Sequence, residues 1–138
     1  MILADTGALL AAFDAGDADH GRAASFVRGL KAADQLVVPS AVVAELGYWF
    51  ELRLTPVGEA SALRRLALAS WRLEHFTPAD LLRAADRVER YSRFPLGTVD
   101  ALIVAMAERL EATTIFTLDR RHFGAVRPAH CDSFELVP

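Results

Sequence analysis

Acidic residues stand beside or inside four separate apolar segments of this chain. They are Asp5, Glu45, Asp100 and Asp119. A carboxylate on an apolar surface costs free energy unless it caps a helix, pairs with a charge or binds a cation. Since all four are placed in this way, we predict that the fold gathers them into one site for a hard divalent metal.

Three of these acids also have a simpler local interpretation. Asp5 could N-cap the helix that follows it, and Asp119 could cap a short turn over residues 120–123. Asp100 would lie in the first turn of a helix, where the helix dipole favours negative charge. Taken singly, each of them is more easily explained as a cap or dipole residue than as a ligand.

Glu45 is harder to explain locally. It lies well past the start of its expected helix and shares a face with Val42 and Trp49. Carboxylates that lie close together repel one another and have raised pKa values unless a cation shares them. An all-oxygen ligand set favours Mg²⁺ or Mn²⁺ over zinc, and Mg²⁺ often bridges to a substrate phosphate. The chemistry that this predicts is hydrolysis of a phosphodiester bond.

Composition limits the class of protein. The 138 residues predict a single domain over 1–138, and 53% apolar residues are enough for a substantial core. A formal charge of −3 argues against nucleic-acid binding by bulk charge. A single cysteine excludes an internal disulfide, and no apolar run reaches the roughly 18 residues of a membrane span. We therefore expect a cytoplasmic protein without a membrane segment.

Short apolar strands alternate with helical patterns along the chain. This alternation predicts an α/β layer fold with a mostly parallel sheet, in which sites form beyond the carboxyl ends of the strands. Asp5 and Asp119 follow two of the expected strands directly. The expected strands are 1–4, 35–38, 71–76, 113–118 and 134–137, and the expected helices are 7–13, 20–33, 40–54, 56–70, 78–92 and 98–112.

The acids occur in motifs that follow one another over nearly the whole chain. These are Asp5-Thr6-Gly7, Ser40 through Glu45, Asp100 through Glu108, and Thr117 through Phe123. In order and spacing they resemble the PIN-domain ribonucleases, specifically the VapC toxins of type II toxin–antitoxin systems. The first motif alone is weak, whereas Asp100-Ala101 followed by Thr117-x-Asp119 one helix and one strand later is specific.

The resemblance implies an endoribonuclease that uses Mg²⁺ or Mn²⁺ and, as a toxin, inhibits translation and growth. It implies that Asp5 and Asp100 are the main metal ligands. Asp119 would complete the metal site directly or through water, and Glu45 would hold or activate a water molecule. All four acids are thus implied to be catalytic.

Four neighbours of these acids have implied or hypothesised supporting roles. By resemblance, Thr6 and Thr117 are hydrogen-bond donors that orient the carboxylates. Arg120 and Arg121 follow Asp119 directly, and we hypothesise that one of them contacts substrate phosphate.

The resemblance also implies a fold and partners. The fold would be PIN-like, a three-layer α/β/α arrangement with a short, mostly parallel sheet. The chain would form a homodimer and bind a VapB-like antitoxin, giving a heterotetramer or larger assembly. A groove for the antitoxin helix could use apolar side chains that are otherwise ordinary core: Phe13, Tyr48, Trp49, Phe50 and Leu52.

Three other classes of protein share single features with this sequence. Aspartic proteases carry Asp-Thr-Gly but are all-β, with strands before the motif, whereas only four residues precede Asp5. Haloacid-dehalogenase-type phosphoryl transferases need a second acid two residues after the first, where Gly7 stands here. A catalytically silent PIN-like interaction module remains the main alternative, although such domains often lack one or more of the acids.

Overall fold

Five parallel strands form the centre of the computed structural model, which describes residues 1–31 and 33–138. The order across the sheet is β3-β2-β1-β4-β5, and every neighbouring pair is parallel. The strands are β1 (Ile2–Ala4), β2 (Leu36–Pro39), β3 (Arg72–Glu74), β4 (Thr114–Phe116) and β5 (Glu135–Val137). The predicted α/β fold with a parallel sheet is confirmed.

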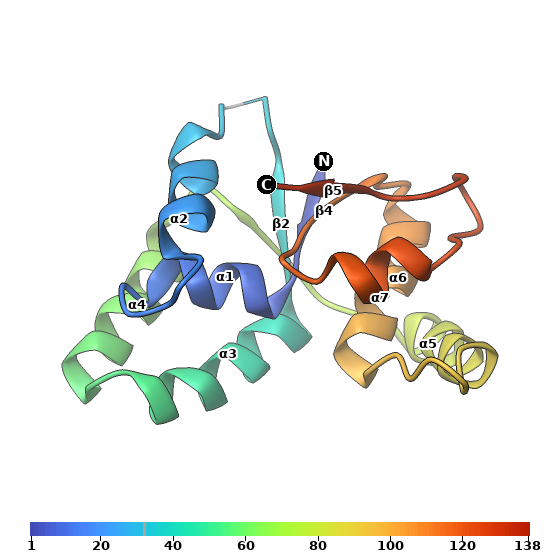
Figure 1. The fold of residues 1–138 in the computed structure, drawn as a ribbon, viewed down its shortest axis with the longest axis horizontal. Helices are drawn as coiled ribbons and strands as arrows, with labels where there is room; N and C mark the ends of the chain where they lie inside the picture. The colour runs from blue at the N-terminus through green and yellow to red at the C-terminus, as the bar shows by residue number, and fades with distance from the viewer. Residues whose placement is uncertain (32) are drawn as a thin grey trace.

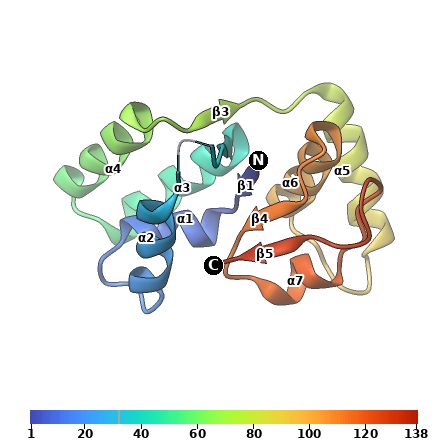
Figure 2. The same cartoon turned by 90° about the horizontal axis from the view of Figure 1, so that it is seen from above.

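Helices cover both sides of this sheet. Figure 1 shows α1 to α4 on one side of the strands and α5 to α7 on the other, and Figure 2 shows the same two groups from above. The helices are α1 (Thr6–Phe13), α2 (His20–Gly29), α3 (Ser40–Arg53), α4 (Pro56–Leu68), α5 (Pro78–Arg90), α6 (Thr98–Leu110) and α7 (Arg120–Ala125). The three-layer α/β/α arrangement is therefore present.

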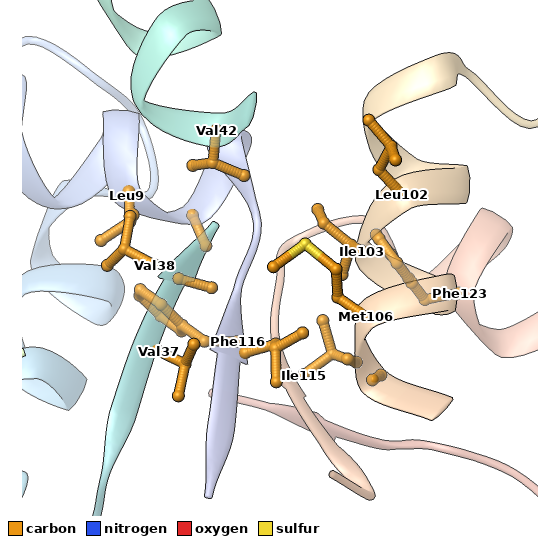
Figure 3. Close-up of a cluster of buried hydrophobic side chains, with 14 of the residues drawn as sticks. Leu9, Val37, Val38, Val42, Leu102, Ile103, Met106, Ile115, Phe116 and Phe123 are labelled. Atoms are coloured by element: carbon orange, nitrogen blue, oxygen red, sulfur yellow. The ribbon is translucent and has the colours of Figure 1, made fainter. Parts of the chain in front are cut away.

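The core lies between the sheet and both helical layers. Figure 3 shows Leu9 of α1 and Val42 of α3 on one side of the strands, with Ile103 and Met106 of α6 on the other. All four side chains are fully buried. Burying a side chain of this size contributes about 1.5–3 kcal/mol, so the two layers are fastened to the sheet chiefly by such contacts.

The position of each strand in the sheet explains its burial. β2 lies inside the sheet and is buried along its whole length, as expected for a parallel strand covered on both faces. β3 and β5 are the edge strands and are largely exposed or half-buried. The prediction that the strands are apolar on both faces thus holds for the central strands only.

Local sequence signals set several helix boundaries. Thr77 accepts a hydrogen bond from the backbone of Asp80, whose side chain accepts one from the Thr77 backbone, and Pro78 is the first helical residue of α5. This capping box satisfies two backbone donors that the helix leaves free. The predicted start of α5 is confirmed in detail.

Other boundaries differ from the predictions. Ser40, a residue type that often caps helices, is not the N-cap of α3: Pro39 occupies that position, and the helix begins at Ser40, the first residue of the predicted range, without a side-chain cap. The chain passes straight from β2 into α3, which leaves no room for a separate cap residue. The turn expected over 120–123 is a short helix, α7.

The second helix is also shorter than predicted. α2 ends at Gly29 instead of reaching residue 33, because Leu30 has an extended backbone and packs against the core. Position 32, within the predicted helix, lies outside the described residues.

Arginines that are interleaved with acids along a helix usually face solvent. Arg87 of α5 is instead buried, 2% exposed, and pairs with Glu108 of α6. No helix within residues 1–31 and 33–138 combines the length and the apolar character needed to span a membrane.

The strand order predicts a crevice beyond the carboxyl ends of the central strands. β1 lies in the middle, and the chain proceeds from it to β2 on one side but later returns to place β4 on the other. In open α/β sheets a crevice forms outside the carboxyl ends of the strands where the direction of winding changes. This position lies beyond β1 and β4, where Asp5 and Asp119 follow their strands.

Candidate functional site

Asp5 and Thr117 are brought together by the pairing of β1 with β4. Ala4 lies opposite Phe116 in this register, so the next residue of each strand is Asp5 and Thr117. The Asp5 backbone donates to the carbonyl of Phe116 at 2.9 Å, and the Thr117 hydroxyl donates to Asp5 Oδ2 at 2.8 Å. Thr117 is 1% exposed, so this hydrogen bond fixes the carboxylate in a dry environment.

The surroundings of Asp5 disfavour its charged form. Its pKa is raised to about 7, chiefly by burial and also by the charges of Asp100 and Asp119, although the Thr117 hydroxyl acts in the opposite direction. Asp5 occupies the N-cap position of α1, but its side chain makes no capping hydrogen bond. Asp5 is therefore the N-cap of α1 by position only, and its buried carboxylate needs another explanation.

Glu45 reaches the same place from α3. Thr6, the first residue of α1, donates its hydroxyl to Glu45 Oε2 at 2.5 Å. Thr6 is buried and follows Asp5 directly, so the hydrogen bond ties α3 to the end of β1. The sequence placed Glu45 toward the core side of its helix, and the structure shows it at the pocket beside that core.

Asp100 lies in the first turn of α6, as predicted. Its pKa is raised to about 6, chiefly by burial and also by the charges of Asp119 and Glu45, although His122 acts in the opposite direction. Because the charges of Glu45 on α3 and of Asp119 and His122 at the start of α7 all act on Asp100, the acids share one environment. Repulsion of this kind is relieved when a cation binds.

Both carboxylate oxygens of Asp119 contact His122. Its Oδ1 accepts the backbone N–H of His122 at 2.8 Å, and its Oδ2 lies 2.6 Å from His122 Nδ1. Burial alone would raise the pKa of Asp119, but these hydrogen bonds and the His122 charge outweigh it and lower the pKa. Asp119 is therefore the N-cap of α7, as the local interpretation predicted, and also a member of the acidic group.

These acids line one open pocket of about 730 Å³. Sequence reasoning found most of the charged lining but did not assign Leu10, Arg53 or Leu118 to the site. Arg53 could have been found, because Glu45, Trp49 and Arg53 recur at every fourth residue of one helix. The lining consists of Asp5, Thr6, Gly7, Leu10, Glu45, Trp49, Arg53, Asp100, Leu118, Asp119, Arg120 and Arg121.

The two arginines after Asp119 both reach the pocket. Arg120 donates to the carbonyl of Pro138 at 2.5 Å, and the Arg121 guanidinium lies 5.1 Å from the centre of the Phe94 ring. Phe94 also packs against His122, with ring centres 4.8 Å apart. Each arginine is thus held by a local partner beside the acids, which leaves its proposed contact with phosphate a hypothesis.

The donor set fits a hard divalent cation. All candidate ligands are carboxylate oxygens, and two of them have pKa values raised by burial, which a cation would offset. Within residues 1–31 and 33–138, no three His, Cys, Asp or Glu side chains are already close enough to form a complete ligand group. Mg²⁺ does not require one, because it keeps several waters and is bound through one or two carboxylates.

The apolar residues considered for a partner groove divide into two groups. Phe50 is fully buried, and Phe13 packs edge-on against it with ring centres 5.6 Å apart, so both belong to the core. The exposed fractions of Tyr48 and Leu52 are 60% and 61%, and that of Trp49 is 36%. Only the latter three remain available to a partner or ligand.

Comparisons with known sequences agree with the motifs. A family model described as the PIN domain matches residues 2–127. The chain is 40% identical to Ribonuclease VapC26 of Mycobacterium tuberculosis over 137 residues, which is 99% of this chain and 100% of that protein.

Solved structures share the fold over its full length. VapC20 of Mycobacterium tuberculosis, described as a Sarcin-Ricin loop cleaving toxin, has a TM-score of 0.83 at 22% identity and covers 100% of both chains. VapBC2 of Rickettsia felis, bound to a DNA fragment from its promoter, has a TM-score of 0.73 at 19% identity, covering 99% of this chain and 97% of that one. At such low identity these likenesses bear on the fold alone.

Proposed function

Because the chain belongs to the PIN-domain family, within its VapC ribonucleases, we propose that it is a Mg²⁺- or Mn²⁺-dependent endoribonuclease that hydrolyses phosphodiester bonds of RNA. The observation that carries the proposal is the meeting of Asp5, Glu45, Asp100 and Asp119 around one pocket. They come from four different elements, and two of them have pKa values raised by burial. Such a group is costly in a protein that does not use it.

We assign Asp5 and Asp100 as the residues that would hold the cation, with Asp119 and Glu45 contributing directly or through water. A bound Mg²⁺ or Mn²⁺ supplies stabilisation of the negative charge that develops on the phosphate and activates a water molecule. The pocket is open to a polymer substrate at its surface.

The residues around these acids have positioning roles in this proposal. Thr117 orients Asp5, and Thr6 orients Glu45, which would hold the attacking water and accept its proton. Arg120 or Arg121 would contact a phosphate of the RNA at the pocket rim.

We also propose that the chain acts as a toxin that inhibits translation and growth and is held inactive by a VapB-like antitoxin. The similarity to Ribonuclease VapC26 supports this assignment. Tyr48, Trp49 and Leu52 offer exposed apolar surface near the acids for an antitoxin helix. The expected assembly is a homodimer, and a heterotetramer or larger complex with the antitoxin.

The nuclease is tested by incubating total cellular RNA with the purified protein in Mg²⁺ or Mn²⁺, in EDTA, and with Asp100→Asn as the control for contaminating nucleases. Discrete fragments that require metal and are lost in the variant are expected. Absence of cleavage by folded, antitoxin-free protein in either metal would instead favour a catalytically silent interaction module.

The toxin role is tested by expression in cells without an antitoxin. Growth arrest is expected from the wild-type chain and not from Asp100→Asn. Normal growth with abundant folded protein would contradict the toxin role while leaving the nuclease untouched.

A further inference from the structure

One face of α3 places a tryptophan, Trp49, at the wall of the acidic pocket. Val42, Leu46 and Phe50 form the buried row of this helix. The adjacent row consists of Glu45, Trp49 and Arg53, and all three line the pocket. Trp49 thus lies one helical turn, about 6 Å along the axis, beyond the glutamate of the candidate site.

Trp49 is not accounted for by the core. Its side chain is 36% exposed, whereas Phe50 beside it is fully buried. A large aromatic ring that remains partly exposed at the wall of a charged pocket has surface available for a ligand. Tyr48 contacts it edge-on from the outer side, with ring centres 5.5 Å apart and planes inclined at 74°.

Arg53 holds this ring in position. Its guanidinium lies 5.6 Å from the centre of the Trp49 ring, and its Nη1 lies 2.9 Å from Asp17 Oδ2 and 3.5 Å from Asp14 Oδ2. Since two carboxylates already balance the charge, Arg53 is better suited to fixing the ring than to attracting phosphate. Such fixing lowers the entropy that a ligand must remove on binding.

We propose that Trp49, positioned by Arg53, is a stacking platform for an unpaired nucleobase of the RNA adjacent to the bond that is cut. The inference rests on the proposed function and extends it to the substrate class: single-stranded RNA, or a loop with an unstacked base. Proteins recognise such RNA by stacking splayed bases on aromatic rings, while basic groups contact the backbone. Here the pocket combines Trp49 with arginines 120 and 121 around the acids.

Fluorescence tests the contact without requiring cleavage. The chain has two tryptophans, so Trp71→Phe leaves Trp49 as the only one, and Asp100→Asn added to it keeps the RNA intact. An oligoribonucleotide should quench Trp49 fluorescence, whereas an abasic oligonucleotide of the same length should not. Equal quenching by both, or none by an oligonucleotide that is shown to bind, would overturn the proposal.

Kinetics test the consequence for the reaction. Replacing a stacking aromatic by alanine weakens binding about 5- to 150-fold per base. Trp49→Ala should therefore raise KM for a short single-stranded RNA substrate by this factor with a smaller change in kcat, and Trp49→Phe should restore most of the loss. Leu68→Ala, which truncates a side chain that is 86% exposed on α4 and outside the pocket, is the matched control and should resemble the wild type.

The outcomes separate this inference from the proposed function. If the wild type cleaves RNA and Trp49→Ala cleaves it with unchanged KM, the nuclease stands and the stacking platform is refuted. If Trp49→Ala weakens only the binding of a cognate antitoxin, the ring is a protein anchor and the proposal also fails. Base-dependent quenching in a protein that never cleaves would support the platform and contradict the enzyme.

Discussion

At the scale of single residues, the acids of the pocket differ in their proton affinity. Burial raises the pKa of Asp5 to about 7 and that of Asp100 to about 6, while hydrogen bonds from His122 lower the pKa of Asp119. Near neutral pH the metal-free site therefore retains part of its protons. A cation that binds Asp5 and Asp100 must displace them, which makes its affinity depend on pH.

The first prediction concerns the stability of the metal-free protein. The pKa of Asp100 is about 6 in the folded chain against an ordinary value of 3.8, so the folded state binds more protons between these values. Stability should therefore fall as pH rises through this window. Asp100→Asn lacks this dependence, and at about pH 8 it should be more stable than the wild type by on the order of 1–3 kcal/mol.

Urea unfolding in EDTA at a series of pH values measures this difference. The advantage of Asp100→Asn should shrink toward zero at about pH 4, where the wild-type carboxyl is largely protonated in the folded chain. A variant that is less stable than the wild type at every pH would mean that the main role of the Asp100 charge is to stabilise the N-terminus of α6 through the helix dipole.

The second prediction concerns the hydroxyl of Thr117. It donates to Asp5 Oδ2 and accepts from the backbone of Asp119 at 2.9 Å, in a position that is 1% exposed. Thr117→Val keeps the shape but leaves both partners unsatisfied, at a cost of about 1–3 kcal/mol in unfolding free energy. Thr117→Ser keeps the hydroxyl and is the control. Equal stabilities of the Val and Ser variants in chemical denaturation would contradict this role.

At the scale of elements, α7 depends on a residue of the candidate site. Asp119 caps the helix through the His122 backbone, and Arg120 and Arg121 begin it. The third prediction separates the two roles of Asp119. Asn at this position can still cap, so Asp119→Asn should lose activity and stay close to the wild type in stability, because the partly exposed pair with His122 that it also removes contributes little. Asp119→Ala should lose activity and also about 1 kcal/mol of stability.

Thermal unfolding and the RNA cleavage assay on the same samples test this separation. The wild type provides the reference for both measurements. A fully active Asp119→Asn variant would show that the residue is a helix cap alone.

The elements also show what sequence reasoning could reach. The start of α5 was predictable because its signals, Thr77 and Pro78, act on residues only a few positions away. The end of α2 was not, because the departure of Leu30 toward the core depends on tertiary packing. The burial of Arg87 is not predictable from local sequence for the same reason, since its partner Glu108 lies on the next helix.

The candidate site was predictable to a similar degree. Each acid stands out because it precedes, interrupts or ends an apolar segment, and parallel strands bring their carboxyl ends to one end of the sheet. The hydrogen bond between Thr117 and Asp5 follows from the pairing of β1 with β4, and no local pattern specifies that pairing. The supporting contact between Arg53 of α3 and Asp17 in the loop between α1 and α2 likewise joins residues far apart in the sequence.

At the scale of the whole molecule, a largely buried network of charged side chains joins α5 and α6 to the segment before β5. Glu108 of α6 accepts hydrogen bonds from Arg87 and Arg83 of α5, and also from the backbone of Ala129 at 2.8 Å. Arg87 further donates to the carbonyl of Arg127 at 3.2 Å. The network thus fastens α5, α6 and the segment before β5 to one another, and α6 carries Asp100 at its start.

The fourth prediction follows from the burial of this network. Removing one member of a buried pair leaves the other charge uncompensated, which costs about 3–5 kcal/mol, whereas replacing both by apolar side chains is often neutral. Glu108→Ala should therefore lower the unfolding free energy by this amount. The double variant Arg87→Met/Glu108→Leu should recover most of it, because Arg83 can turn its half-exposed side chain to solvent. Urea denaturation of the two variants and the wild type decides the matter: a double variant as unstable as Glu108→Ala would mean that the contacts to Arg83 and Ala129, rather than the pair with Arg87, hold this layer together.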